Sequence, residues 1–134
     1  MINKCYKCSS NNLRVITRKK DYNVKGKLII EIEEKILTCM ECGEKIFDNE
    51  IEKENLEVLY DKYRKKKELL GPQEIIKIRE SYNLSQTMFA KILGISEKAI
   101  ERYEKNTIID EIDNKTIVFA SKPENMKKLM GKYE

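Results

Sequence analysis

Residues 85–106 have the sequence SQTMFAKILGISEKAIERYEKN, which predicts two short helices joined by a tight turn. Ser85 is a residue type that caps helix N-termini, and apolar residues follow it at helical spacing: Met88, Phe89, Ile92 and Leu93. Gly94 stands just past them, where a left-handed C-terminal cap favours glycine. Ser96 should cap the second helix, which Asn106 is expected to end, and whose apolar face is Ala99, Ile100 and Tyr103. Two helices joined at a glycine are the sequence form of a helix-turn-helix.

An ordinary helical hairpin inside a bundle would show much of the same pattern. The distinguishing feature is the joint occurrence of Gln86, Phe89-Ala90, Leu93-Gly94, Ser96, Ile100, Tyr103 and Glu104. This combination resembles the helix-turn-helix of the phage-repressor (Xre-like) family. The resemblance implies that the stretch binds DNA.

In a helix-turn-helix the second helix enters the major groove and the first helix crosses the DNA backbone. Lys98 and Arg102 can donate to guanine O6 and N7, and Glu97 or Glu101 can accept from cytosine N4. The two N-terminal residues of the first helix suit phosphate contacts. Such motifs normally act as symmetric dimers, so we expect a homodimer on double-stranded operator DNA. The candidate DNA-binding residues are Gln86, Thr87, Ser96, Glu97, Lys98, Glu101 and Arg102.

All four cysteines of the chain stand in two C-x-x-C pairs, Cys5 with Cys8 and Cys39 with Cys42. Four thiolates give Zn²⁺ a closed tetrahedral site, and a two-residue spacer lets one turn offer two sulfurs to one ion. Gly43 follows the second pair, where such a turn favours a positive φ. Two disulfides or two redox-active pairs are the alternatives. The spacing favours a structural zinc site.

One residue type that is common in catalytic sites is missing. The chain has no histidine, which removes the commonest general base and every histidine-activated nucleophile. A zinc ion held by four thiolates has no open position for a catalytic water. The sequence therefore predicts a protein that is not an enzyme.

The segment between the cysteine pairs predicts a small antiparallel sheet. Apolar and polar residues alternate over 13–18 and 28–33, with a turn expected at Lys25-Gly26-Lys27. Residues 36–38 are expected to form a third short strand leading into the second cysteine pair. The basic run Arg18-Lys19-Lys20 fits a solvated loop, or alternatively a contact with phosphate or an acidic partner.

From Asp48 the apolar spacing becomes helical, with one face made by Ile51, Leu56, Leu59, Tyr60 and Tyr63. The basic residues 64–67 suit a solvated C-terminal end of this helix and a hinge, or alternatively a contact with the DNA backbone. The helical pattern breaks at Leu69-Leu70-Gly71-Pro72, and we place the domain boundary there. Residues 1–70 are then the zinc-binding domain with its linking helix, and residues 71–134 are the second domain.

The second domain is expected to contain five helices. Pro72 suits the first position of a helix buried through Ile75, Ile76, Ile78 and Tyr82. The two helices of the motif follow. Two further helices are marked by Ile112, Thr116, Phe119 and Ala120, and then by Met126, Leu129, Met130 and Tyr133. The predicted fold class is therefore α+β: a zinc-bound sheet followed by an all-α repressor-like domain.

Composition agrees with this organisation. The chain has 134 residues and a net charge of +4, which is compatible with nucleic acid, and 37% of its residues are charged. A domain with so little apolar material benefits from a metal. No apolar run approaches the roughly 20 residues that span a membrane, and the N-terminus lacks the apolar core of a signal peptide. We therefore expect a cytoplasmic protein with reduced cysteines and no membrane partner.

The order of these parts resembles the MqsA-type antitoxins of bacterial toxin–antitoxin modules. The resemblance covers essentially the full chain and is carried by Cys5-x-x-Cys8, Cys39-x-x-Cys42 and residues 96–105. It implies that the four cysteines bind a structural zinc and that the N-terminal domain engages a cognate toxin. It also implies that the C-terminal domain dimerises and binds the operator of its own operon, with Lys98 and Arg102 as base-reading residues. Lys98 stands where that family usually has asparagine.

Other interpretations of the same sequence exist. Residues 60–126 are similar to the N-terminal module of longer antitoxins that carry a SocA-like (Panacea) domain. The four thiolates would also suit a stand-alone transcriptional regulator that senses metal or oxidant, because oxidation of the sulfurs would release zinc. A zinc-dependent enzyme is the third alternative.

Overall fold

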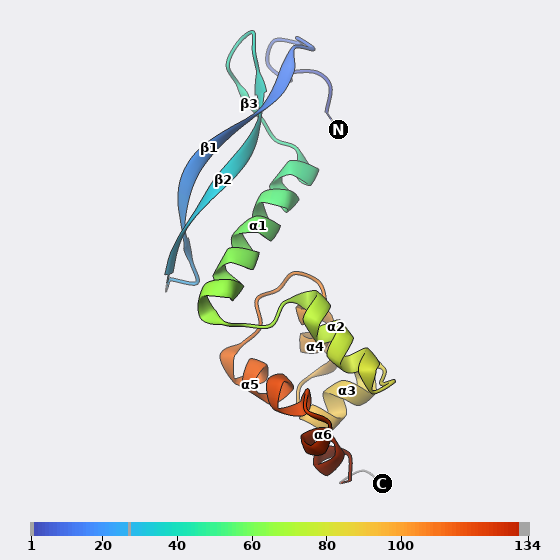
Figure 1. Cartoon of the computed structure of the whole chain (residues 1–134). Helices are drawn as coiled ribbons and strands as arrows, with labels where there is room; N and C mark the ends of the chain where they lie inside the picture. Colours follow the sequence, from blue (N-terminus) through green and yellow to red (C-terminus); the bar gives the residue numbers. More distant parts are fainter. Residues whose placement is uncertain (1, 27, 132–134) are drawn as a thin grey trace. The chain divides into compact units, whose positions relative to one another are not determined.

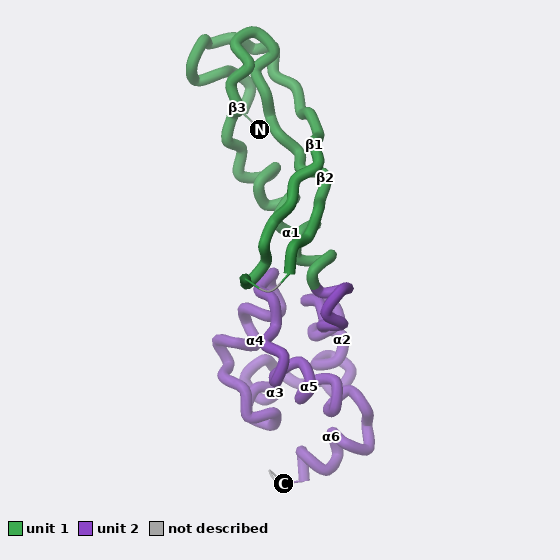
Figure 2. Tube along the Cα trace, turned by 90° about the vertical axis from the view of Figure 1, so that its left-hand side faces the viewer, with its two compact units in different colours: residues 1–63 green, residues 64–134 purple. Residues whose placement is uncertain are grey.

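The computed structural model describes residues 2–26 and 28–131 and divides into two compact units. The division falls between Tyr63 and Arg64 (Figure 2). The sequence instead places a boundary after residue 70, at the end of the linking segment. Lys27 of the expected turn and Tyr133 of the expected last helix lie outside the described residues.

The first unit is built on a long β-hairpin (Figure 1). Strands β1 (Leu13–Val24) and β2 (Leu28–Cys39) pair antiparallel over their whole length, and β3 (Lys45–Ile46) adds to the other side of β2. The sheet order is β1-β2-β3. The predicted antiparallel sheet is confirmed, but the expected third strand at 36–38 is wrong. Those residues continue β2, and the third strand follows the second cysteine pair.

Helix α1 (Asn49–Lys67) begins at a buried aspartate, because Asp48 Oδ2 accepts from the backbone N–H of Ile51 at 3.1 Å. This is a side-chain cap of the helix N-terminus. Ile51, Leu59 and Tyr63 are buried as predicted. Leu56 departs from the predicted apolar face, since 42% of it stays exposed.

Arg64 does not belong to a solvated basic cluster. It is only 4% exposed, and its guanidinium donates to the backbone oxygen and the side-chain oxygen of Asn106, at 3.2 and 3.0 Å. Asn106 is therefore an acceptor for Arg64 and does not end the second motif helix. That helix ends at Tyr103, with Glu104 as its right-handed cap. Lys65, Lys66 and Lys67 are exposed, as expected for a helix end.

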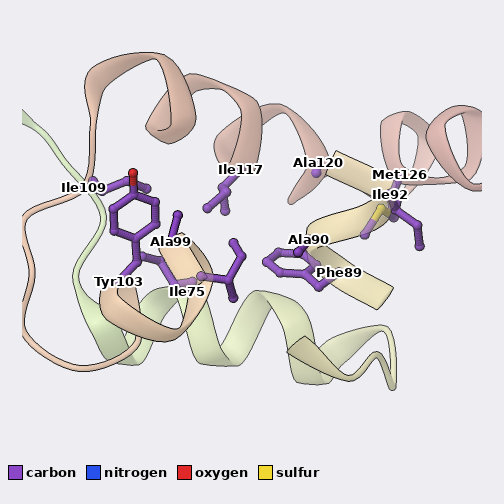
Figure 3. Packing of buried hydrophobic residues seen from close by; sticks show 11 residues of the cluster. Ile75, Phe89, Ala90, Ile92, Ala99, Tyr103, Ile109, Ile117, Ala120 and Met126 are labelled. Atoms are coloured by element: carbon purple, nitrogen blue, oxygen red, sulfur yellow. The ribbon is translucent and has the colours of Figure 1, made fainter. Parts of the chain in front are cut away.

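The second unit is all-α over its described residues. It contains α2 (Pro72–Ser81), α3 (Gln86–Leu93), α4 (Glu97–Tyr103), α5 (Glu111–Ala120) and α6 (Pro123–Met130). These five helices confirm the predicted architecture. Their shared core is shown in Figure 3 and comprises Ile75, Phe89, Ala90, Ile92, Ala99, Ile100, Tyr103, Ile109, Ile117, Ala120 and Met126.

Polar contacts tie the helices around this core. The Tyr82 hydroxyl donates to the carbonyl of Ala120 at 2.7 Å, and the Tyr103 hydroxyl donates to Asp113 at 2.6 Å. Burial raises the pKa of Tyr103 to about 12, and the bond to Asp113 adds to the shift. A neutral, hydrogen-bonded tyrosine therefore holds the end of α4 against α5.

Candidate metal centre and nucleic-acid interface

The two cysteine pairs fold into turns with the same hydrogen bonds. In the first, the N–H of Ser9 donates to the carbonyl of Cys5 at 2.9 Å, and in the second Gly43 donates to Cys39 at 2.8 Å. Ser9 and Gly43 both adopt positive φ, at 63° and 76°. Each turn therefore reverses the chain directly after its second cysteine. The sequence predicted this conformation at Gly43 but gave no sign of it at Ser9.

Changing Gly43→Ala should weaken the metal centre. A Cβ at this position would meet no atom within 4 Å, so the cost is the left-handed backbone alone, about 1–2 kcal/mol. The expected result is a lower apparent zinc affinity in competition with a chelator. Ser9→Gly is the companion change, because it relieves the same conformation and should not lower the affinity. Equal affinities for Gly43→Ala and the parent protein would contradict this assignment.

The four thiols converge on one point. Their sulfur atoms all lie within 4.8 Å of one another, with Cys5–Cys42 at 3.7 Å and Cys8–Cys39 at 3.5 Å. Sulfurs at the corners of a tetrahedron around zinc lie about 3.8 Å apart, whereas a disulfide requires about 2.05 Å. All four cysteines are free thiols. The donor set and its spacing therefore fit Zn²⁺, and the two-disulfide alternative does not fit.

The surroundings of the Cys39 sulfur favour its thiolate, whereas the neighbouring thiols raise the pKa of Cys8 and Cys42. The backbone N–H of Cys42, followed by that of Glu41, lowers the pKa of Cys39 to about 7 despite burial of the sulfur. Such N–H groups stabilise negative charge on sulfur. Glu44 joins the two turns from outside, since it accepts from the Tyr6 hydroxyl at 2.7 Å and from the Lys7 ammonium at 3.3 Å.

The metal centre is continuous with a small apolar core. Cys5 and Cys39 are buried together with Leu37, Ile46 and Ile51, and Leu13 packs against this group. The register pairs Leu13 with Cys39, so the first turn enters β1 where β2 runs into the second turn. A bound zinc would thus clamp the open end of the hairpin and the start of α1. Four thiolates leave no position for water, so the site is structural.

Helices α3 and α4 have the caps that the sequence predicts. Ser85 Oγ accepts from the N–H of Met88, and Ser96 Oγ accepts from the N–H of Ala99, each at 3.1 Å. Gly94 is left-handed, with φ 73°. These local signals fix both helix starts and the turn between them.

The residues predicted to contact DNA divide into two groups. Lys98, Glu101 and Arg102 are exposed on the side of α4 opposite its buried residues. The others already have protein partners: Ser96 caps α4, the Thr87 hydroxyl donates to Glu97 at 2.6 Å, and the half-buried Gln86 amide donates to Glu104 Oε1 at 3.0 Å. The structure therefore brings all seven to the α3–α4 region and leaves three with unengaged side chains within the described part of the chain.

Sequence analysis missed the ion pair that fixes α4. Arg79 Nε donates to Glu104 Oε2 at 2.7 Å and Arg79 Nη2 donates to Glu104 Oε1 at 2.9 Å. A third bond runs from Arg79 Nη1 to the carbonyl of Leu84 at 2.9 Å. The Glu104 side chain is 5% exposed. The motif itself contains Glu104, but no local pattern in the sequence indicates that its partner is Arg79 on α2.

Within the residues that the structure describes, no helix combines the length and the apolar character that crossing a lipid bilayer requires.

Comparison with known proteins gives one family. Residues 3–117 match the family described as the antitoxin component of the bacterial toxin–antitoxin system, MqsA. No curated protein matches the sequence. The match extends from the first cysteine turn through α4 and into α5, so it includes both the cysteine cluster and the helix-turn-helix. The family is one of antitoxins and not of enzymes. With its four-thiol metal centre and its capped pair of helices, the chain belongs to the MqsA antitoxin family.

Proposed function

We propose that this antitoxin binds its cognate toxin through the N-terminal unit and represses its own operon through α3 and α4. The proposal is supported by the family match, which spans both units. It is also supported by the outward side of α4, which presents Lys98 and Arg102 to solvent. The DNA-binding domain is assigned to residues 71–134 and the toxin-binding domain to residues 1–70.

Helix α4 is the element proposed to enter the major groove. Lys98 and Arg102 are one helical turn apart and carry donors suited to guanine. The Glu97 carboxylate accepts a hydrogen bond from Thr87 at the start of α4, so it already has a protein partner. Glu101 is the remaining acceptor and suits the amino group of cytosine. Two copies in a symmetric dimer would place two such helices about 34 Å apart on one face of the operator.

Arg102→Ala should weaken binding to the operon's own promoter by about 1–3 kcal/mol, because it removes a base contact. The measurement is fluorescence anisotropy with the promoter duplex and a scrambled duplex at fixed salt. Lys127→Ala is the matched control, because Lys127 is an exposed cation on α6. An equal loss on both duplexes would reassign Arg102 to phosphate contact. No loss on either duplex would remove α4 from the interface.

Toxin binding is tested with the product of the adjacent gene. Expression of that product alone should stop growth, and co-expression of the full antitoxin should restore growth. The two proteins should also co-purify. A neighbouring product that is harmless, or that fails to co-purify, would refute the toxin half of the proposal while leaving DNA binding open to its own test.

A further inference from the structure

Strand β1 has an open outer edge, whereas the corresponding edge of β2 is covered. Figure 1 shows β1 on the side of the hairpin away from α1. On the far side of β2, Asn55 donates to the carbonyl of Lys35 at 2.8 Å and accepts from its N–H at 2.9 Å. Lys62 Nζ donates to the carbonyl of Glu31 at 3.0 Å. Side chains of α1 therefore occupy that edge, and only β1 offers a long free edge within the described sheet.

The bonds of Asn55 show which groups of β1 point outward. They place the N–H and C=O of Lys35 on the side of β2 away from β1. The register pairs Lys35 with Thr17, so this pair is of the type that exchanges no backbone hydrogen bonds. The N–H and C=O of Thr17 must then point to the outer edge. By alternation the same holds for Val15, Lys19 and Asp21.

The charges of the β1 side chains indicate what kind of partner this edge fits. Residues 14–21 are all exposed, and they include four cations, Arg14, Arg18, Lys19 and Lys20, against the single acid Asp21. Arg18 is partly neutralised by the buried Glu34, 3.4 Å away, but the other three have no acidic partner in the described structure. Two copies of such an edge would repel each other. The edge therefore suits an acidic segment of a different protein.

An apolar hollow lies on the face of the hairpin that packs against α1. It has a volume of about 120 Å³ and is lined by Tyr22, Ile32, Glu52, Asn55, Leu56 and Leu59. Leu56, the residue that departs from the predicted buried face of α1, forms part of its wall. Ile16, on the same face of β1, is 43% exposed. The hollow can take an apolar side chain of a segment that runs along β1.

We propose that the cognate toxin adds an extended acidic segment to the outer edge of β1. The backbone of that segment would pair with Val15, Thr17, Lys19 and Asp21, and its acidic side chains would face Lys19 and Lys20. One apolar side chain would enter the hollow beside Leu56. Main-chain pairing supplies affinity in such strand addition, and side-chain pockets supply specificity. This inference rests on the proposed toxin binding and specifies its site.

Residue-resolved amide hydrogen exchange tests the geometry directly. In the free zinc-loaded antitoxin, the amides of Val15, Thr17, Lys19 and Asp21 should exchange fast. Those of Ile16, Arg18 and Lys20 should exchange slowly because they bond to β2. Addition of saturating purified product of the adjacent gene should slow the first set by about tenfold or more. If that set stays fast in a complex that demonstrably forms, the β1 edge is not the docking site.

Substitutions on β1 test how much this edge contributes to the affinity of the antitoxin for the toxin. Thr17→Pro removes one outward N–H and leaves the β1–β2 bonds in place, and Thr17→Val is its control. Lys19→Glu reverses one charge at the edge, and Lys53→Glu makes the same change at an exposed position of α1. Thr17→Pro and Lys19→Glu should each weaken toxin binding by about tenfold, and the two controls should not. If Thr17→Pro fails to fold, the toxin affinity of Lys19→Glu alone decides whether the β1 edge is the binding site.

The outcomes separate this inference from the proposed function. Full toxin binding by Lys19→Glu and by folded Thr17→Pro would overturn the edge site and leave toxin binding standing. No binding by the unmodified antitoxin would overturn both. If Lys19→Glu instead weakens operator binding alone, the basic strand contacts DNA phosphate and the inference is wrong. A change only in the self-association of the antitoxin would likewise overturn it.

Discussion

Cys39→Ser should leave the N-terminal unit unfolded while the helical unit stays folded. Cys39 is fully buried, and its sulfur lies 3.5 Å from that of Cys8 at the centre of the thiol cluster. Structural zinc supplies about 10–16 kcal/mol of binding free energy in small domains, and loss of one thiolate opens the site. The apolar group around the cluster is small, so it is not expected to hold the hairpin alone.

Zinc content and a two-dimensional amide NMR spectrum measure this prediction. Cys39→Ser should lose its zinc and the dispersed resonances of residues 13–46, and the resonances of α2 to α6 should persist. Met40→Ser is the matched control, because Met40 stands in the same turn, is 49% exposed and is not a ligand. A dispersed spectrum for the hairpin of zinc-free Cys39→Ser would refute the structural role of the metal.

Glu104→Ala should destabilise the second unit by about 3–5 kcal/mol, because it leaves Arg79 largely buried without its counter-ion. The side chains of this pair are 17% and 5% exposed, and they share two hydrogen bonds. The change also removes the acceptor of Gln86. A loss of this size is a large part of the total stability of a small domain.

Thermal and chemical unfolding, followed by helical circular dichroism, measure the effect. Glu101→Ala is the control on the same helix, because Glu101 is exposed, and it should change stability by less than about 0.5 kcal/mol. The double change of Arg79→Met with Glu104→Met should cost less than Glu104→Ala alone, since no buried charge is then left unpaired. Equal stability of Glu104→Ala and Glu101→Ala would show that the pair does not hold α4.

Features set by local sequence were predictable. The caps at Ser85, Gly94 and Ser96 involve neighbours within a few residues, and their geometry agrees with the prediction. The metal centre was predictable for the same reason, because each C-x-x-C turn is a local structure and zinc needs all four sulfurs. The antiparallel pairing of β1 with β2 and the five helices followed from apolar periodicity, whereas β3 did not.

Features set by long-range contacts were not predictable. Glu33, Glu34 and Lys35 interrupt the alternation of β2, so the sequence divided it into two strands. In the structure, Glu34 is buried on the face toward α1, where it accepts from the Tyr22 hydroxyl and from Arg18, and the strand continues. Charge patterning alone cannot identify such a buried carboxylate.

Arg64 illustrates the same point in a helix. Three lysines follow it, and a run of four cations is normally solvated. Its burial depends on two acceptors at Asn106, far along the chain, which no local pattern indicates. The DNA-contacting residues stay predictions, because their roles depend on a duplex and on a second copy of the chain.

The most direct test of the whole account is a separation-of-function measurement with the full chain. Cells carrying the adjacent toxin gene and a reporter under the operon's promoter would express the antitoxin as Arg102→Ala or as Cys39→Ser. We predict that Arg102→Ala restores growth but fails to repress the reporter, and that Cys39→Ser fails to restore growth. Loss of growth rescue by Arg102→Ala, or full rescue by Cys39→Ser, would contradict the assignment of toxin and DNA to separate units.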